Sequence, residues 1–223
     1  MLAGEAVVAI WTGFDPEVRD QAYDWYINEH SLERVGIPGF RRGRRYIAAG
    51  PATSPEHFHL YEADSMQVLQ GSDYANRLNN PTPTTKFMMT RGHGETFRVM
   101  GRVNFSHGPG IGGMVLTIRF DCAAEHLPAL RAVVLAAAQE PRVTGAHLCI
   151  GDLEASAVRT AETRDRSDIQ APPNLFIMVE GTDAEALANT LPDASLIQSG
   201  AQAPFVRGVY RLEYVRTKTA FAP

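Results

Sequence analysis

Cysteine is scarce in this 223-residue sequence, which contains only Cys122 and Cys149 and no CxxC pair. A disulfide-stapled secreted domain would carry more cysteines, so we expect two free thiols in a reducing compartment. A basic excess is missing as well, since 21 lysines and arginines stand against 25 acidic residues and the net charge is −4. Because a general nucleic-acid binder needs a basic field to attract phosphates, we expect no nucleic-acid partner.

Long hydrophobic runs are also absent. The apolar runs 114–118 and 132–138 are far shorter than the roughly 20 residues of a membrane-spanning helix. Residues 1–10 contain Glu5 and lack the basic and long apolar regions of a signal peptide. We therefore expect a cytoplasmic protein without a membrane partner. With 44% hydrophobic and 21% charged residues, the composition is that of a globular protein with a sizeable core.

Hydrophobic periodicity and turn signals divide the chain into two halves with the same order of elements, β-α-β-β-α-β. The expected strands are 5–12, 40–49, 57–63, 95–105, 114–121, 144–152, 174–180 and 205–216. The expected helices are 16–34, one that begins near residue 64, 123–139 and 182–191. A glycine-rich linker, residues 107–113, separates a first unit (1–106) from a second, diverged unit (114–223). We predict an α+β fold of two tandem ferredoxin-like units, packed sheet to sheet as an α/β barrel that encloses a small-molecule pocket.

Two stretches are predicted to be loops. Residues 154–171 are polar, charged and poor in large apolar side chains, which is typical of a mobile loop. Residues 79–85 and 88–91 follow the second helix and contain two prolines and two asparagines. This second loop would either close the barrel mouth or pack on the outside.

A motif in the first half resembles a known family. It consists of Trp25–His30 (Trp-Tyr-Ile-Asn-Glu-His), then Pro38–Phe40 (Pro-Gly-Phe), then Arg45 and Tyr46 on the second strand. This pattern resembles the EthD-like group of the dimeric α/β-barrel superfamily over about residues 7–105, whereas the second half matches in element order alone. The resemblance implies the barrel fold and a pocket for a small molecule. The superfamily includes cofactor-free cyclases, isomerases, decarboxylases and monooxygenases, and also haem-binding members, so the reaction stays open.

The third strand carries the sharpest local feature, the His-x-His pair of His57 and His59. Alternation places His57, His59 and Tyr61 on one strand face, and Phe58 and Leu60 on the other. We assign the apolar face to the helices, so the imidazoles and the phenol are predicted to line the barrel interior. The alternatives are a water-filled, structurally satisfied cavity and a reversed face.

His30 is the second candidate. It lies four residues after Tyr26 near the end of the first helix. The resemblance implies that this histidine points toward the barrel opening, where we expect an acid/base role. The alternative is a structural histidine that caps the helix. His57 and His59 have a metal-ligand spacing with His30 as a third donor, but no carboxylate shares their strand face and no further His or Cys stands beside them. We therefore predict no metal.

Arginines supply the expected positive charge of the pocket. Arg98 and Arg102 alternate with apolar residues on the fourth strand and are predicted to face the interior. Arg45 belongs to the Arg-Tyr pair that matches the family. One of these guanidinium groups could hold a carboxylate or enolate oxygen. The other arginines of the second strand are interpreted as solvated groups on an edge strand.

These observations predict a small-molecule enzyme without a tightly bound organic cofactor, which carries out proton transfer of the cyclase, isomerase or decarboxylase type in a barrel pocket. His30 and His59 are the predicted catalytic residues. The predicted substrate-binding residues are His57, Tyr61, Tyr26, Arg45, Arg98 and Arg102. The alternatives are a non-catalytic protein that binds a small ligand, a haem or a His-bound metal, and a cofactor-free monooxygenase. Exposed sheet edges would allow a homodimer.

Overall fold

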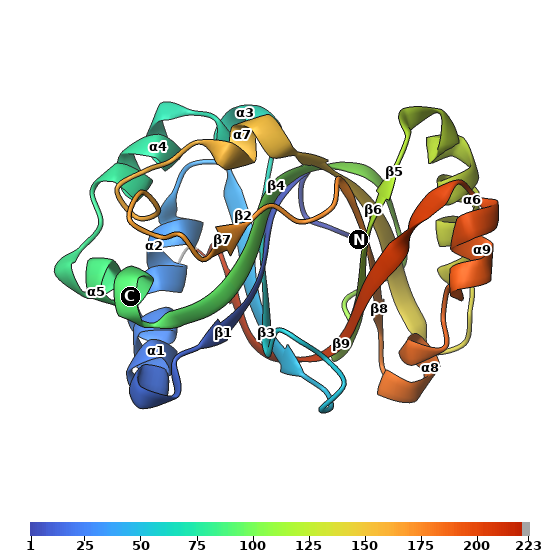
Figure 1. Ribbon diagram of the computed structural model, residues 1–223, viewed down its shortest axis with the longest axis horizontal. Coiled ribbons are helices and arrows are strands. Elements are labelled where there is room, and N and C mark those ends of the chain that lie inside the picture. Colours follow the sequence, from blue (N-terminus) through green and yellow to red (C-terminus); the bar gives the residue numbers. More distant parts are fainter. Residues whose placement is uncertain (220–223) are drawn as a thin grey trace.

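Within residues 1–219, the part of the chain that the computed structural model describes, eight antiparallel strands close into a barrel (Figure 1). A short further strand, β7, pairs in parallel with β4. The strands are β1 (Ala6–Phe14), β2 (Phe40–Ala48), β3 (His57–Ala63), β4 (His93–His107), β5 (Met114–Cys122), β6 (Val143–Asp152), β7 (Ile169–Gln170), β8 (Leu175–Gly181) and β9 (Ala201–Thr217). The first half has the strand order β2-β3-β1-β4, and the second has β9-β5-β8-β6. Because β2 pairs with β9 and β4 with β6, the edges of the two sheets join, and the predicted α+β barrel is confirmed.

Helices cover the barrel on two opposite sides (Figure 1). The helices and helical turns are η1 (Pro16–Val18), α1 (Arg19–Trp25), η2 (Tyr26–His30), α2 (Ser31–Gly36), α3 (Met66–Leu69), α4 (Ser72–Asn79), α5 (Pro83–Arg91), η3 (Ala124–His126), α6 (Leu127–Ala137), α7 (Leu153–Ala157), α8 (Ala184–Ala188) and α9 (Asp193–Gln198). The prediction of a loop at 88–91 was wrong, because α5 runs through it. The hydroxyl of Thr82 caps α5 by accepting a hydrogen bond from the Thr85 amide, and Pro83 suits the first helical position.

The space beneath the helices differs between the two halves. Under α6, α8 and α9, aliphatic side chains fill the second half, among them Leu116, Ile118, Leu130, Val134 and Leu187. The corresponding core of the first half is more aromatic and includes Trp25, Tyr26, Phe40, Tyr61 and Tyr74. A cavity lies among these aromatic residues.

Among residues 1–219, apolar side chains pack the barrel interior where the pocket was predicted. Phe58 and Leu60 point inward and belong to an apolar core that draws on both halves. The ring of Phe58 lies 5.1 Å from that of Trp11 and 5.8 Å from that of Tyr210, measured between centroids. The prediction of a ligand pocket between the sheets was therefore wrong.

A cluster of buried ionisable groups also lies within the barrel, and we call Arg44, Glu62, His147 and Glu180 the interior charge cluster. Arg44 is 0% exposed, and its guanidinium lies 2.9 Å from a carboxylate oxygen of Glu62 and 2.8 Å from one of Glu180. His147 Nε2 lies 3.1 Å from the other oxygen of Glu180. Burial alone would raise the pKa of Glu180, but His147 and Arg44 lower it to about 2. The cluster thus holds paired charges in a dry interior.

No helix among residues 1–219 is long and apolar enough to cross a bilayer. Cys122 and Cys149 are both buried free thiols, as the sequence predicts.

Candidate active site

A cavity of about 460 Å³ lies between the outer face of the first-half strands and the helices that cover it. Strands β1, β3 and β4 form its floor, and η2, α2 and α4 form one wall. Residues of the 152–169 stretch from the second half form the opposite wall. Its volume falls within the roughly 300–1,000 Å³ of small-molecule sites.

The His-x-His strand faces this cavity and not the barrel interior. His59 and Tyr61 line the cavity, and His57 points to the same, helix-covered side. The predicted orientation of this strand was therefore reversed. Every residue of β3 is buried because helices cover one face and the second sheet covers the other, so neither face is marked by solvent exposure.

His30 reaches the cavity through a turn of π-helix. In η2 the amide of Ser31 donates to the carbonyl of Tyr26, five residues earlier, which widens the helix by one residue. The ring of His30 then lies on that of Trp25, with 4.3 Å between centroids. Only 5% of His30 is exposed, and its Nδ1 atom has no hydrogen-bond partner among the described residues.

Three imidazoles of the cavity wall are kept neutral by their surroundings. Burial lowers the pKa of His30 and of His59 well below the usual 6.5, and nearby positive charge, chiefly Arg34 for His30, lowers it further. Burial also lowers the pKa of His93 to about 3. The Nε2 atoms of His59 and His93 lack hydrogen-bond partners within the described residues. At neutral pH these rings can therefore accept a proton or a hydrogen bond from a ligand.

Sequence reasoning missed His93. It is the first residue of β4, whereas the predicted strand begins two residues later. Its ring contacts Phe14 and Trp25, at 5.4 and 6.1 Å between centroids. An earlier strand start would have placed it across from β1, because His93 pairs with Phe14 in the register of the two strands.

Two phenols complete the polar part of the floor. Tyr61 donates a hydrogen bond of 3.1 Å to the hydroxyl of Tyr26, and both residues line the cavity. Burial raises the pKa of Tyr26 to about 12 and that of Tyr61 well above 10. Both groups stay protonated at neutral pH and can donate hydrogen bonds.

The predicted arginines lie in three different environments. Arg98 lines the cavity and donates to the hydroxyl of Tyr74 at 3.2 Å. Arg45 lies behind the wall, since its guanidinium covers the rings of Tyr23 and Tyr26 at 4.6 and 4.9 Å and pairs with Glu213. Arg102 is exposed. The predicted inward orientation of Arg98 and Arg102 was wrong, because this face of β4 continues the helix-covered side.

His57 does not line the cavity. Its Nε2 atom lies 3.1 Å from the hydroxyl of Tyr23, and its other nitrogen lies 3.7 Å from Glu56. Burial lowers its pKa to about 4. His57 thus supports the aromatic wall from behind, and its predicted contact with substrate is not supported by this position.

The polar stretch 153–170, which we call the cover segment, closes the cavity from the side of the second half. The sequence predicts a mobile loop here, but the segment contains α7 and β7 and docks on the first half (Figure 1). The amide of Glu162 donates to the carbonyl of Leu78, and the amide of Ala161 donates to the side chain of Asn79. Arg166 donates to the hydroxyl of Thr96 at 2.8 Å.

Among residues 1–219, no group of three or more His, Cys, Asp or Glu side chains is arranged to hold a metal ion. The rings of His57 and His59 lie 6.2 Å apart and face different neighbours.

No family model matches the sequence, and no curated protein matches it. Among solved structures, an anthrone oxidase-like protein has a TM-score of 0.59 at 13% identity, covering 95% of this chain and 92% of that one. A proposed monooxygenase from Fusobacterium nucleatum has a TM-score of 0.58 at 8% identity, covering 97% and 96%. A proposed chlorite dismutase has a TM-score of 0.59 at 7% identity, covering 95% and 96%. Likeness at such low identity extends to the fold alone.

Proposed function

We propose that the protein is a small-molecule enzyme that binds a planar aromatic or keto-type compound in this cavity and removes a proton from a carbon atom conjugated with a carbonyl group. The observation that carries the proposal is the buried, unpartnered imidazole of His30 in a largely apolar cavity. The imidazole is neutral, so it has a free lone pair to accept a proton, and the ring of Trp25 packs against it at 4.3 Å between centroids.

The remaining polar groups would serve binding and charge stabilisation. His59 lies on the floor of the cavity and would return the proton or orient the substrate. Tyr61, Tyr26 and Arg98 would donate hydrogen bonds to oxygen atoms of the substrate. Proton removal of this kind needs no tightly bound organic cofactor, and isomerisation, cyclisation and decarboxylation can all begin or end with it.

A cofactor-free oxidation begins with the same step, because the carbanion of a suitable aromatic ketone reacts with dioxygen. The likeness in fold to an anthrone oxidase-like protein and to a proposed monooxygenase is the reason to include dioxygen among the tests. The rival proposal is a protein that binds a small ligand or a haem without turnover. A haem would show itself as a Soret band after reconstitution.

Anthrone is a suitable first probe, since it is a planar tricyclic ketone with an acidic methylene group. The protein should accelerate exchange of the methylene hydrogens with deuterium under nitrogen, followed by proton NMR. Replacing His30 by asparagine should slow this exchange about a hundredfold, the scale of a lost general base. His59→Asn should slow it less, and His107→Asn, an exposed histidine far from the cavity, should not change it.

An undiminished rate in folded His30→Asn protein would remove His30 from the mechanism. Oxygen uptake by the wild type in air, lost in the same variant, would favour the oxygenase reading. If the wild type binds anthrone-type compounds but exchanges no hydrogen, the binding protein becomes the better proposal.

The pH dependence gives an independent check. Because the pKa of His30 is lowered, the base stays neutral in mild acid, and kcat/KM should stay level from about pH 8 to about pH 6. The rate should fall only at lower pH, as His30 takes up a proton. An inflection near the ordinary histidine pKa of about 6.5 would show that the base is solvated and is not the buried ring.

A further inference from the structure

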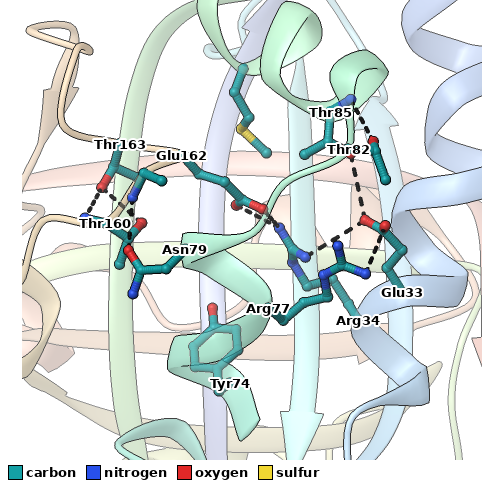
Figure 2. Close-up of polar contacts among 12 residues, drawn as sticks. Glu33, Arg34, Tyr74, Arg77, Asn79, Thr82, Thr85, Thr160, Glu162 and Thr163 are labelled. Carbon is teal, nitrogen blue, oxygen red and sulfur yellow. Dashed lines mark hydrogen bonds and ion pairs between the residues drawn. The ribbon is translucent and has the colours of Figure 1, made fainter. Parts of the chain in front are cut away.

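A second group beside His30 carries an unused hydrogen-bond donor. Arg34 is 3% exposed, and its Nη2 atom donates to both carboxylate oxygens of Glu162, at 2.6 and 2.5 Å (Figure 2). Its Nη1 atom is buried and has no hydrogen-bond partner among the described residues. A carboxylate oxygen of Glu33 lies 3.9 Å from Nη1, which is beyond hydrogen-bond distance. A buried N–H without an acceptor is costly, so a ligand atom is the natural partner.

The charges around Arg34 balance without a ligand. Glu162 pairs with Arg34, and Glu33 pairs with Arg77 at 3.0 Å, which gives two acids and two arginines (Figure 2). A permanently anionic group beside Arg34 would add a negative charge to these two balanced ion pairs. A neutral carbonyl oxygen would instead accept the free N–H and would gain stabilisation as negative charge develops on it.

Arg34 also lies in the right place relative to the proposed base. His30 and Arg34 are four residues apart, on one side of the helical segment, and both line the cavity. Side chains at this spacing have Cβ atoms roughly 5–6 Å apart. A planar ketone that lies along them would present its oxygen to Arg34 and its acidic carbon to His30.

We propose that Arg34 is a further catalytic residue, which binds the carbonyl oxygen of a neutral aromatic ketone while His30 takes the proton. This inference rests on the proposed function and narrows its substrate class. In the step, the C–H bond breaks, the proton goes to a ring nitrogen of His30, and the electron pair moves through the conjugated system to the oxygen. The resulting enolate oxygen accepts the Nη1 hydrogen bond.

Glu162 acts as a positioning residue in this arrangement. It belongs to the cover segment, and its backbone is tied to Leu78 while its carboxylate holds the guanidinium. Neither Glu162 nor its partner Arg34 would be fixed without the other. The second half of the chain therefore completes the site of the first.

The closing experiment uses 2-naphthol, a neutral aromatic phenol whose ionisation is followed by fluorescence. Bound naphtholate imitates the enolate, so the free N–H of Arg34 should lower the pKa of the bound phenol. Arg34→Met should raise that bound pKa by about one unit relative to the wild type, the scale of one charge-assisted hydrogen bond. Glu162→Gln should give an intermediate pKa of the bound phenol and lower kcat of anthrone exchange with little change in KM.

Two further variants keep the test decisive. Arg34→Met leaves Glu162 buried without its partner. If the Arg34→Met protein does not fold, the double variant Arg34→Met/Glu162→Gln takes its place, because it removes both charges. Arg164→Met removes an exposed arginine of the cover segment and should leave the bound pKa unchanged.

A bound pKa that is the same in the wild type and in both Arg34 variants overturns the role of Arg34. Wild-type protein that binds 1-naphthoate but not 2-naphthol overturns the substrate class. Either result leaves His30 as a base. An anthrone exchange rate in the His30→Asn variant equal to that of the wild type would instead reject the proposed function itself.

Discussion

Replacing Arg44 by methionine should lower the free energy of unfolding by about 3–5 kcal/mol, although Arg44 does not line the cavity. The substitution leaves Glu180 with His147 alone and takes from Glu62 one of its two arginines, inside a barrel where water cannot replace them. An unpaired carboxylate in such surroundings either stays charged at high cost or takes up a proton. Equilibrium unfolding in guanidinium chloride measures the change.

Arg41→Met is the matched control for Arg44→Met. Arg41 is three residues away on the same strand and pairs with Asp64 at the surface, where both side chains are largely exposed. An exposed ion pair contributes about 0–1 kcal/mol, so this variant should unfold almost as the wild type does. Equal losses in the two variants would show that the interior charge cluster is no more important than a surface pair.

Mild acid should destabilise the protein strongly, because desolvation holds four histidines of the first half in the neutral form. The pKa of His57 is lowered to about 4 and that of His93 to about 3, and those of His30 and His59 are also lowered. The unfolded chain takes up protons near the ordinary pKa of about 6.5, whereas the folded protein does not, so stability is fully present above that pH and falls below it. By about pH 5, His57 and His93 should each account for a loss of about 2 kcal/mol.

Guanidinium unfolding at a series of pH values checks this prediction, and His93→Asn supplies the comparison. The variant lacks one titrating group, so its stability should fall less steeply between neutral pH and mild acid. The matching control is His107→Asn, because an exposed histidine should leave the slope unchanged. A wild-type stability that is level across this range would mean that the four imidazoles are hydrated in solution.

The order of elements was predictable from the sequence because it depends on local signals. Alternation, Pro and Gly at turns, and helix caps are read within a few residues, and they placed each barrel strand correctly. Local signals could not decide which face of β3 turns toward the helices. All seven residues of β3 are buried, so His57, His59 and Tyr61 alternate with Phe58 and Leu60 without any polar, solvated face to orient the strand.

Pairings between the two halves could not be predicted. Arg44 pairs with Glu180, 136 residues away, and was interpreted as a solvated arginine of an edge strand. Arg34 pairs with Glu162, 128 residues away, in a stretch that looks disordered by composition. Charged residues of this kind resemble surface groups in the sequence, and only closure of the barrel brings their partners within reach.

Closure of the barrel within one polypeptide has a consequence for how the two sides can change. In a ring of two identical subunits, every substitution occurs twice, so both outer faces must keep the same shape. Here each face can change independently of the other. The aliphatic core beneath α6, α8 and α9 can give rigidity, while the opposite face keeps its cavity. A mutation that changes the shape of the cavity is therefore not repeated on the opposite face. One side can adapt to a ligand, and the other can supply the cover segment.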